Sequence, residues 1–449
     1  MVQTALENLL AQVRARLEQG DLSGAVMLIE ALRPPDQADL FSALDEANQA
    51  ALLPRLDPGD SADILEELED EDAARLVDQL SVVDLARIVD EMEPDEAADL
   101  LTELSVDRVS AILSRLEDPN EVRPLLIHPE DSAGGLMTSS FLALRQRMAA
   151  AEALAAIRKL EPDSEEIYLF FVVDQHGRLS GEVSLRDLVM AEPDALLQDV
   201  MDPDVISAAV GLDQEEVARL VSRYDLAVLP VVDADNVLVG VITVDDVLDV
   251  LAEEATEDIQ RLGGAQPLEQ AYFSVSMPLI VRKRIGWLLF LFLADTLTGT
   301  VLRAFEDELA TAVALSFFIP LIIGTGGNTG SQTVTTIVRA LALGEVRLRD
   351  VMRVVWRESA VGLMLGLLLG AVGFFRALTW HTGVNIALVV SLTLLVVVVW
   401  SNLVAAVVPI LAERLKIDPS VVSAPLITSV VDATGLLIYF SLAKFLLGI

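Results

Sequence analysis

The sequence predicts a multidomain protein with an acidic all-α N-terminal solenoid, a tandem α/β repeat, a long acidic connecting helix and an all-α domain of five transmembrane helices. Three observations predict this order. The charge is divided unevenly, because residues 1–270 hold 59 Asp and Glu against 18 Lys and Arg, whereas residues 271–449 hold 10 against 13. Two internal repeats of different period lie in the acidic part, and five long apolar segments lie in the remainder. An acidic, water-exposed region is thus followed by a membrane region.

The composition also excludes several classes of function. An acidic region of this size repels nucleic acid and anionic lipid surfaces, and it attracts divalent cations. The chain has no cysteine and only three histidines, which are isolated, so thiol chemistry and a zinc site are excluded. The sequence opens without a basic or apolar leader segment, so we expect the acidic part to stay in the cytoplasm.

The N-terminal domain, residues 1–130, contains an internal repeat with a period of about 12 residues. Each unit opens with a cap-type or acidic residue and continues with apolar residues at helical spacing. Such a unit has room for one short helix and a turn, so we expect a small helical solenoid. Most of its carboxylates are expected to lie at helix starts, where the helix dipole favours them. The units are Glu69–Leu80, Ser81–Met92, Glu93–Leu104 and Ser105–Leu116.

Residues 131–252 hold a second repeat. Phe171–Asp187 matches Pro230–Asp246, and each copy predicts a strand, a turn, a second strand and a helix, with another helix before them. The second copy contains a glycine, two apolar residues, a Thr and, three positions later, an Asp; the first copy has the same pattern with Ser184 and with Glu182 at one of the apolar positions. The two copies, at about 138–195 and 202–252, resemble a tandem pair of CBS domains.

This resemblance implies a regulatory module that binds an adenine nucleotide. In such pairs a Ser or Thr and an Asp contact phosphate and ribose, which indicates Ser184, Arg186 and Asp187 in the first copy. Leu169 and Leu226 offer no aromatic face to an adenine ring. We therefore expect ATP to be at most a weak regulatory ligand.

An acidic amphipathic helix is predicted over Val247–Leu262, within a connecting segment of residues 247–270. Gly263 and Gly264 are expected to end this helix. The basic triplet Arg282–Arg284 then precedes the first membrane span.

The transmembrane domain, residues 271–449, offers five apolar segments, each near the roughly 20 residues that a spanning helix needs. Arg and Lys cluster before span 1, between spans 2 and 3, and between spans 4 and 5. These loops are therefore expected on the inside together with the N-terminus, which places the C-terminus outside. The predicted spans are residues 285–303, 311–338, 358–378, 385–411 and 421–446.

The second span contains the polar run Gly324–Gln332, which follows Pro320. The run is too polar for lipid, and non-helical backbone is tolerated at membrane depth only where it is buried or lines water. We therefore expect a break in this helix that faces an ion, with Gly327, Asn328 and Thr329 lining the path. The alternatives are close helix packing through glycine and a phosphate loop, although the phosphate loop lacks its lysine and its preceding strand.

Asp432 lies in the fifth span, where a carboxylate costs several kcal/mol unless it meets water, an ion or a polar partner. Asn402 is another polar residue inside an apolar segment, the fourth span. Pro409 is expected to break the helix of that span. Hydrated Mg²⁺ suits such a lining, because it dehydrates reluctantly and is usually held by one or two carboxylates through its waters. One Asp432 from each chain of a two-fold dimer would supply that arrangement.

Asp295 lies near the middle of the first span and is expected to face protein or water, not lipid. Two roles stay open for it. The carboxylate either lines the ion path or packs against a neighbouring hydroxyl, such as that of Thr296, that of Thr298 or one on a facing helix.

The order of these parts and two of their motifs resemble the MgtE family of magnesium channels and transporters. The motifs are GTGGNTGSQ at Gly324–Gln332 and SAPLITSVVDATGLLIYF at Ser423–Phe440. The resemblance covers essentially the whole chain. It implies a homodimer in the cytoplasmic membrane, a pore on the two-fold axis with Asp432 as its carboxylate, and a cytoplasmic part that closes when Mg²⁺ bridges its acidic surfaces.

The resemblance also implies which carboxylates of the cytoplasmic part bind Mg²⁺. Three departures from the family pattern accompany this: Ala424 stands where a family member has Asn, Leu169 and Leu226 stand where aromatic residues are found, and Asp295 stands where one has Gly. Asp63, the weakest of the implied ligands, stands where a family member has Glu. The implied Mg²⁺-binding residues are Asp63, Asp95 and Asp99 in the solenoid, Asp225 and Asp246 in the CBS pair, Asp249, Glu254, Glu257 and Asp258 in the connecting helix, and Asp418 at the membrane side.

From these features we expect a Mg²⁺-selective channel or transporter that is gated by intracellular Mg²⁺ and is not an enzyme. Two other classes stay open. A proton- or Na⁺-coupled carrier of divalent cations would use the same membrane part, and dependence of flux on a proton gradient would identify it. A sensor or interaction protein would use the membrane part only as an anchor, which needs no polar run inside a span.

Overall fold

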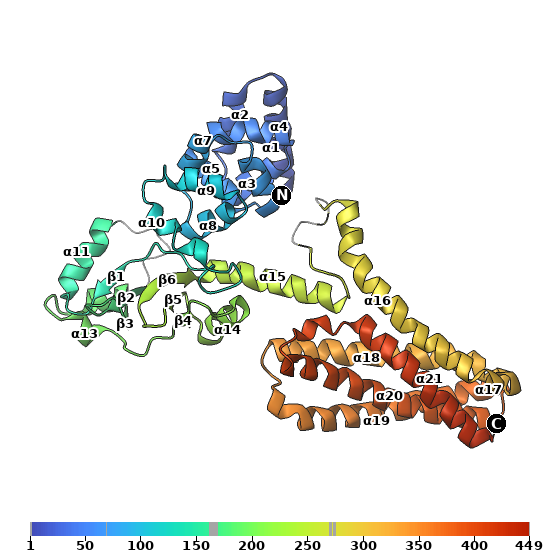
Figure 1. Ribbon diagram of the computed structural model, residues 1–449. Coiled ribbons are helices and arrows are strands. Elements are labelled where there is room, and N and C mark those ends of the chain that lie inside the picture. The colour runs from blue at the N-terminus through green and yellow to red at the C-terminus, as the bar shows by residue number, and fades with distance from the viewer. Residues whose placement is uncertain (1, 69, 161–168, 269–271, 273–274, 449) are drawn as a thin grey trace. The chain divides into compact units, whose positions relative to one another are not determined.

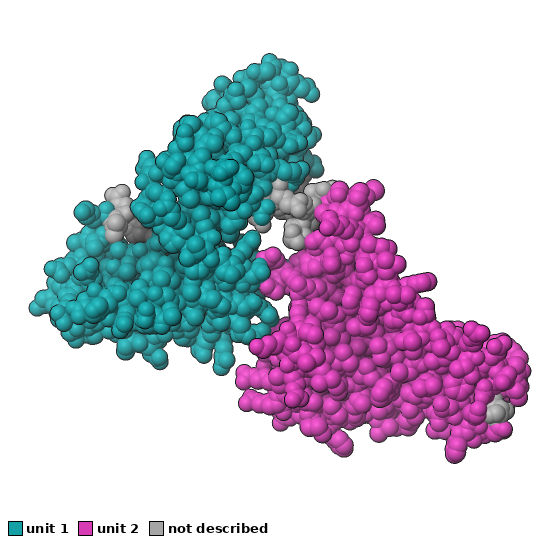
Figure 2. Space-filling model, viewed as in Figure 1, with its two compact units in different colours: residues 1–252 teal, residues 253–449 magenta. Residues whose placement is uncertain are grey.

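The computed structural model describes residues 2–68, 70–160, 169–268, 272 and 275–448. They belong to two compact units, residues 1–252 and 253–449, which Figure 2 colours separately. The first unit contains the solenoid and the tandem repeat. The second unit contains the end of the connecting helix and the long apolar helices (Figure 1).

Short helices make up the first part of the chain, as the 12-residue repeat predicts. Four of them, α6 to α9, coincide with the four repeat units, although residue 69 lies outside the described residues. Apolar side chains at helical spacing, such as Leu85, Val89 and Leu101, form their common core. The elements are α1 (Val2–Glu18), α2 (Leu22–Ile29), α3 (Pro34–Ser42), α4 (Glu46–Leu52), η1 (Leu53–Arg55), α5 (Pro58–Glu66), α6 (Asp70–Val77), α7 (Val82–Val89), α8 (Pro94–Thr102), α9 (Val106–Leu113), α10 (Pro119–Val122) and η2 (Leu125–Ile127).

Several carboxylates of the solenoid cap helix N-termini. The side chains of Asp21, Asp45 and Asp57 accept hydrogen bonds from backbone N–H groups in the first turns of α2, α4 and α5. The Ser81 hydroxyl does the same for α7. These bonds satisfy donors that a helix start leaves free. Part of the acidity is therefore structural, as expected.

The tandem repeat folds into two α/β copies, each with a three-stranded sheet. In both sheets the first strand pairs parallel with the second, and the second pairs antiparallel with the third. The helices expected before Phe171 and before Pro230 are present, whereas residues 161–168 lie outside the described residues. The elements are β1 (Ala143–Arg145), α11 (Ala150–Leu160), β2 (Leu169–Val173), β3 (Leu179–Ser184), α12 (Leu185–Met190), α13 (Leu197–Val200), β4 (Ala208–Ala209), α14 (Gln214–Tyr224), β5 (Val228–Val232) and β6 (Leu238–Thr243).

The connecting helix α15 (Val244–Leu262) continues directly from β6. Its first turns place Val247 and Val250 in the core shared by the solenoid and the second copy. The helix ends before Gly263, as predicted, and Gly264 has a φ of +75° that favours glycine. Residues 263–268 of the predicted connecting segment are not helical, and residues 269 and 270 lie outside the described residues.

Five helices in the described part of the second unit are long and apolar enough to cross a membrane, which confirms the predicted class of this domain. They extend beyond the predicted spans at most ends, because amphipathic turns continue the helices past the apolar segments. Helices α18, α20 and α21 pack against one another, α19 packs against α20, and α16 packs against α21. The elements are α16 (Met277–Ala304), α17 (Glu306–Thr311), η3 (Val313–Phe318), α18 (Ile319–Ala342), η4 (Leu348–Asp350), α19 (Val351–Thr379), α20 (Val384–Arg414), η5 (Pro419–Val421) and α21 (Ala424–Leu447).

The expected breaks in the second and fourth spans are wrong. Helix α18 runs without interruption through Gly324–Gln332, and α20 continues through Pro409. The glycines instead allow close packing, because a Cβ at Gly326 would lie 2.8 Å from Val431 Cγ1 and one at Gly330 would lie 2.7 Å from Ser401 Oγ. Contacts with neighbouring helices therefore override the low helix propensity of the run.

Small residues also allow α19 to pack closely against α20. Gly362, Gly366 and Gly370 recur every four positions on the face of α19 that meets α20. A Cβ at Gly366 would lie 2.9 Å from both Cα and the carbonyl oxygen of Leu395. Backbone atoms cannot move aside as the tip of a side chain can, so these glycines permit a contact that larger residues would prevent.

We expect Gly366→Ala to destabilise the membrane unit by about 1–3 kcal/mol, because the added methyl group forces α19 and α20 apart. Thermal unfolding of the purified protein in detergent measures this loss. Gly299→Ala on α16 is the matched control, since a Cβ there meets nothing within 4 Å. Equal midpoints for both variants would contradict the close-packing argument.

Candidate ion path and regulatory carboxylates

The predicted pore residues of α18 lie on different sides of that helix. Gly327 faces α21, where a Cβ would lie 2.8 Å from Thr428 Cγ2. The Thr329 hydroxyl donates to the carbonyl oxygens of Thr325 at 2.9 Å and Gly326 at 3.0 Å, so it is satisfied within its own helix. Asn328 is exposed in a single chain. Of these three, Asn328 therefore presents its polar side chain outward.

Asp432 lies on α21 and is partly buried. Its Oδ1 atom is buried without a hydrogen-bond partner among the described residues. The Asp295 carboxylate on α16 lies within electrostatic range of it. An unpaired carboxylate oxygen in a membrane helix is a costly feature that an ion or its water shell can stabilise.

Asp295 has a hydrogen-bond partner on a facing helix, one of the possibilities expected from the sequence. The Ser429 hydroxyl of α21 donates to Asp295 Oδ1 at 2.7 Å. Thr296 instead donates to the Leu293 carbonyl oxygen, and Thr298 Oγ1 is buried without a partner among the described residues.

Asn402 is 1 % exposed and faces α19. Its Nδ2 lies 3.5 Å from Glu358 Oε2, and its Oδ1 is buried without a partner among the described residues. The Thr333 side chain of α18 also hydrogen-bonds to Glu358. Glu358 was not among the predicted intramembrane carboxylates, because it is the first residue of the predicted third span. Arg357 beside it resembled the end of a loop.

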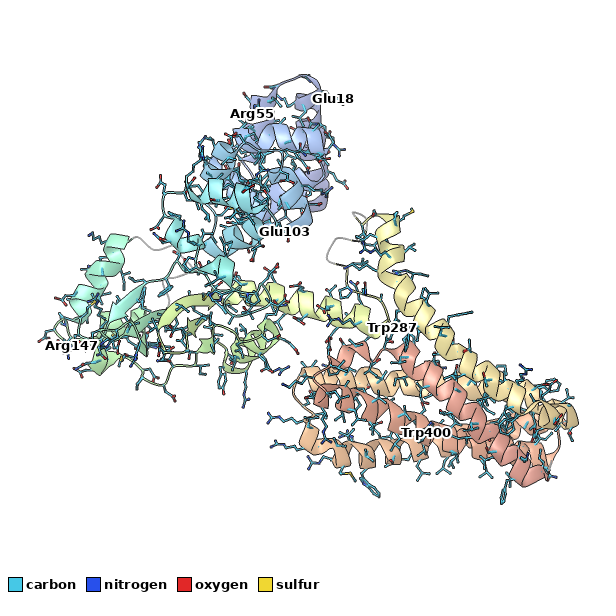
Figure 3. All side chains as sticks on the ribbon, viewed as in Figure 1. Glu18, Arg55, Glu103, Arg147, Trp287 and Trp400 are labelled. Carbon is cyan, nitrogen blue, oxygen red and sulfur yellow. The ribbon has the colours of Figure 1, made fainter. Side chains whose placement is uncertain are left out.

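Two tryptophans hold neighbouring helices of this unit together (Figure 3). Trp287 Nε1 on α16 donates to Ser423 Oγ at 3.1 Å, at the start of α21. Trp400 Nε1 on α20 donates to Thr434 Oγ1 at 2.9 Å. Both bonds orient α21, the helix that carries Asp432.

In the first unit, carboxylates from the solenoid and from the start of α15 lie close together. Asp95 on α8 is 5 % exposed, and its Oδ1 has no partner among the described residues. Burial raises the pKa of Asp95 well above its ordinary value, and the nearby Asp246 raises it further. Burial, with Asp95 and Asp99, also raises the pKa of Glu96 to about 9. The predicted residues Asp95, Asp99 and Asp246 therefore form one acidic cluster with Glu96.

Asp246 is tied to its own helix start. The Thr243 hydroxyl donates to Asp246 Oδ2 at 2.5 Å, which lowers its pKa, but burial outweighs this bond and raises the pKa to about 6. Burial, and then the nearby Asp249, raise the pKa of Glu67. Asp249 therefore lies on the same acidic surface as the cluster.

Asp63 lies at the edge of this surface. Burial, and then Asp60, raise the pKa of Asp63. The neighbouring Glu66 has a raised pKa chiefly through burial, although its Oε1 accepts the backbone N–H of Glu93 at 2.9 Å. Three further carboxylates of this surface were not predicted. Glu96 lies in the first turn of α8, where the helix-start role accounts for acidic residues, whereas Glu66 and Glu67 lie at the end of α5, outside the four repeat units.

Asp225 differs from the other predicted carboxylates in its backbone conformation. It ends α14 in the left-handed region, with a φ of +53°, and its backbone N–H donates to the Val221 carbonyl oxygen. Asp tolerates this conformation better than most residues, so a helix-ending role accounts for it. Its side chain is exposed.

The second half of α15 meets the segment before α21 within the second unit. Burial raises the pKa of Asp258, and the nearby Asp418 and Glu254 raise it further. The Ser420 hydroxyl donates to Asp418 Oδ2 at 2.7 Å. Arg261, which the sequence analysis did not select, forms ion pairs with both Glu257 and Asp418. The predicted residues Glu254, Glu257, Asp258 and Asp418 are thus neighbours here.

Carboxylates of both units are crowded but not arranged as a closed metal cage. Within the described ranges, no group of three or more His, Asp and Glu side chains has the geometry to hold a metal ion directly. Crowded, desolvated carboxylates with raised pKa values gain stability from any cation that neutralises them. The unpaired oxygen of Asp95 and the charge of its neighbours fit a hydrated divalent cation, which is bound through its waters.

The predicted nucleotide residues lie at the end of β3 and the start of α12. The Ser184 hydroxyl donates to Asp187 Oδ2 at 2.5 Å and accepts the Asp187 N–H at 3.1 Å, so both residues serve the helix start. Arg186 and Asp187 are exposed. Leu169 lines a cavity of about 30 Å³ between the two copies. Ser184, Arg186 and Asp187 do not line this cavity.

Comparison with known proteins identifies three regions. A family model described as a divalent cation transporter, MgtE, matches residues 319–442, one described as the MgtE intracellular N domain matches residues 32–131, and the CBS domain model matches residues 133–194 and 197–253.

Three curated relatives carry the name Magnesium transporter MgtE. The protein of Thermus thermophilus is 45 % identical over 73 % of this chain and 72 % of its own length. The protein of Bacillus subtilis is 34 % identical over 72 % of this chain and 71 % of its own length. The protein of Enterococcus faecalis is 33 % identical over 73 % of this chain and 72 % of its own length.

Two solved structures resemble the first part of the chain. One is a crystal structure of the cytosolic domain of the Mg²⁺ channel MgtE in complex with ATP, with a TM-score of 0.51 and 37 % identity over 54 % of this chain and 99 % of that one. The other is a crystal structure of the soluble part of a magnesium transporter, with a TM-score of 0.50 and 32 % identity. This match covers 56 % of this chain and 99 % of that one. The chain is therefore a membrane protein that belongs to the MgtE family of divalent cation transporters.

Proposed function

We propose that this chain is a Mg²⁺-selective channel or transporter of the cytoplasmic membrane, gated by intracellular Mg²⁺. The observation that carries the proposal is Asp432, whose unpaired carboxylate oxygen lies in a membrane helix packed against the glycine-rich α18. Hydrated Mg²⁺ fits one or two carboxylates better than a cage of protein ligands. The relatives named magnesium transporters support this choice of cation.

The pore requires a second copy of the chain in this proposal. Asp432 supplies one carboxylate per chain, and a two-fold axis would bring two of them to one path. Asn328, Gly327 and Thr329 on α18 and Asn402 on α20 are the other proposed pore-lining positions. The exposed side chain of Asn328 suits a surface that a partner or water covers.

Gating follows from the crowding of carboxylates in the cytoplasmic part. At low Mg²⁺, the carboxylates within the cluster around Asp95 and Asp246 repel one another. The carboxylates within the group around Asp258 and Asp418 do the same, and this repulsion favours a looser arrangement. Bound Mg²⁺ neutralises them and stabilises the compact, closed state. A differential binding free energy of about 5.5 kcal/mol is enough to move such an equilibrium from 1:99 to 99:1.

The proposed orientation places the N-terminus and the cytoplasmic domains inside and the C-terminus outside. Arg282–Arg284, the arginines between α18 and α19, and Arg414 with Lys416 then share the inner side. An odd number of spans is consistent with this arrangement.

A proton- or Na⁺-coupled carrier is the second candidate, and Asp295 and Glu358 favour it because coupling paths use further intramembrane carboxylates. Mg²⁺ flux into liposomes that contain the purified protein decides between the two. A channel conducts Mg²⁺ without a proton or Na⁺ gradient. Flux that appears only when one of these gradients is imposed would establish the carrier instead.

Asp432→Asn is expected to lower Mg²⁺ flux at least tenfold while the protein stays folded, because the substitution keeps the side-chain shape and removes the permeation charge. Flux into liposomes measures the change, and thermal unfolding checks the fold. Glu345→Gln, which removes an exposed carboxylate between α18 and α19, is the control. Wild-type flux in Asp432→Asn would show that this residue is not the pore carboxylate.

Limited proteolysis of the whole protein is expected to slow as Mg²⁺ rises to roughly millimolar levels, because the cation bridges the crowded carboxylates. In Asp95→Asn/Asp246→Asn, cleavage should respond much less to Mg²⁺, since both the repulsion and the ligands are reduced. Asp187→Asn is the matched control, because Asp187 holds the same place in the first copy but is exposed. Equal protection by monovalent salt of the same ionic strength would refute Mg²⁺ sensing.

ATP is expected to bind weakly at Ser184, Arg186 and Asp187, because Leu169 and Leu226 provide no aromatic face. Isothermal calorimetry on the wild-type protein and on Arg186→Ala measures this binding. The variant should lose the remaining heat signal, since Arg186 is the phosphate-binding cation of the set. Tight binding that survives Arg186→Ala would place the nucleotide elsewhere.

A further inference from the structure

We propose that Asp295 is a second carboxylate of the ion path and that it acts with Asp432 to attract the hydrated divalent cation. This inference rests on the proposed function, because it adds a residue to the path of which Asp432 is the proposed centre.

The position of the carboxylate is fixed by a hydrogen bond between helices. The Ser429 hydroxyl on α21 donates to Asp295 Oδ1 at 2.7 Å. Ser429 lies three positions before Asp432, so the two residues are neighbours on the surface of α21. The bond therefore keeps the Asp295 carboxylate beside Asp432, within electrostatic range.

Two like charges at this place are unfavourable unless something compensates them. Like-charged carboxylates repel, and the low dielectric of a membrane domain strengthens the repulsion. Among the described residues, neither carboxylate forms an ion pair with a basic side chain. A divalent cation is the ligand that two neighbouring carboxylates favour over a monovalent one.

Two polar atoms on the same two helices, α16 and α21, lack hydrogen-bond partners. Asp432 Oδ1 and Thr298 Oγ1 are both buried without a hydrogen-bond partner in the described ranges. Thr298 follows Asp295 by three positions on α16, so both lie on one side of that helix. The water shell of a hydrated cation can donate to these oxygens, whereas apolar packing cannot.

The exposure of Asp295 distinguishes a role in the ion path from a role in helix packing alone. Asp295 is exposed in a single chain, although it lies in a membrane helix whose Phe292, Leu293 and Leu297 are also exposed. A carboxylate with only a packing role would be covered by its neighbours. An exposed one must meet water or another protein surface, because contact with acyl chains would cost several kcal/mol. An aqueous ion path next to Asp432 meets this requirement.

The test is Asp295→Asn, which keeps the side-chain shape and still accepts the Ser429 hydrogen bond through its amide oxygen. The concentration of Mg²⁺ at half-maximal flux into liposomes should rise about tenfold, while the maximal rate changes little, because the lost charge attracts the cation and does not shape the path. Asp295→Glu should restore most of the wild-type behaviour. Ser429→Ala should give a smaller shift in the same direction.

Asp307→Asn, which removes a carboxylate just beyond the end of α16, is the matched control and should leave the half-maximal concentration unchanged. A purely structural role predicts the opposite pattern for Asp295→Asn: a lower thermal midpoint and an unchanged half-maximal concentration. That result would overturn the proposal. A wild-type protein that carries no Mg²⁺ would instead overturn the proposed function itself.

Discussion

Carboxylate charge in surroundings poor in water is the constraint on which both units of this protein depend. In the first unit, burial and mutual repulsion raise the pKa values of Asp95, Glu96 and Asp246. In the second unit, Asp432 and Asp295 lie side by side in membrane helices. Each arrangement is costly as long as its charges are uncompensated. A protein that responds to and carries a divalent cation can use that cost, because the cation removes it.

The close packing of the membrane helices determines where these charges lie. Glycines at 326, 327 and 330 bring α18 against α20 and α21, and those of α19 bring it against α20. In a membrane, such contacts replace the hydrophobic driving force that packs helices in water. The hydrogen bonds of Trp287 and Trp400 then fix the start and the middle of α21. Asp432 is held in place by helix packing and not by ligands of its own.

The two copies of the α/β repeat show how one motif acquires two roles. Ser184 and Asp187 in the first copy, and Thr243 and Asp246 in the second, form the same hydroxyl–carboxylate bond at a helix start. The first pair stays at the surface. The second carboxylate lies beneath the solenoid beside Asp95, where burial raises its pKa to about 6. The local geometry is common to both, and only the covering domain gives the second carboxylate its buried, acidic surroundings.

The sequence by itself determined the order of the parts, the two repeats, the five membrane helices and the family, because periodicity, charge and motifs are local properties. It did not determine the continuity of α18, because the polar glycine run predicts a break that packing against α20 and α21 prevents. It also missed Glu96, Glu66 and Glu358, whose local surroundings are those of an ordinary helix start, helix end and span end. The partnership of Asp295 with Ser429, across 134 positions, was decided only by the tertiary structure. Electrostatic function depends on distance in space and on burial, and neither can be calculated from the spacing of residues along a chain.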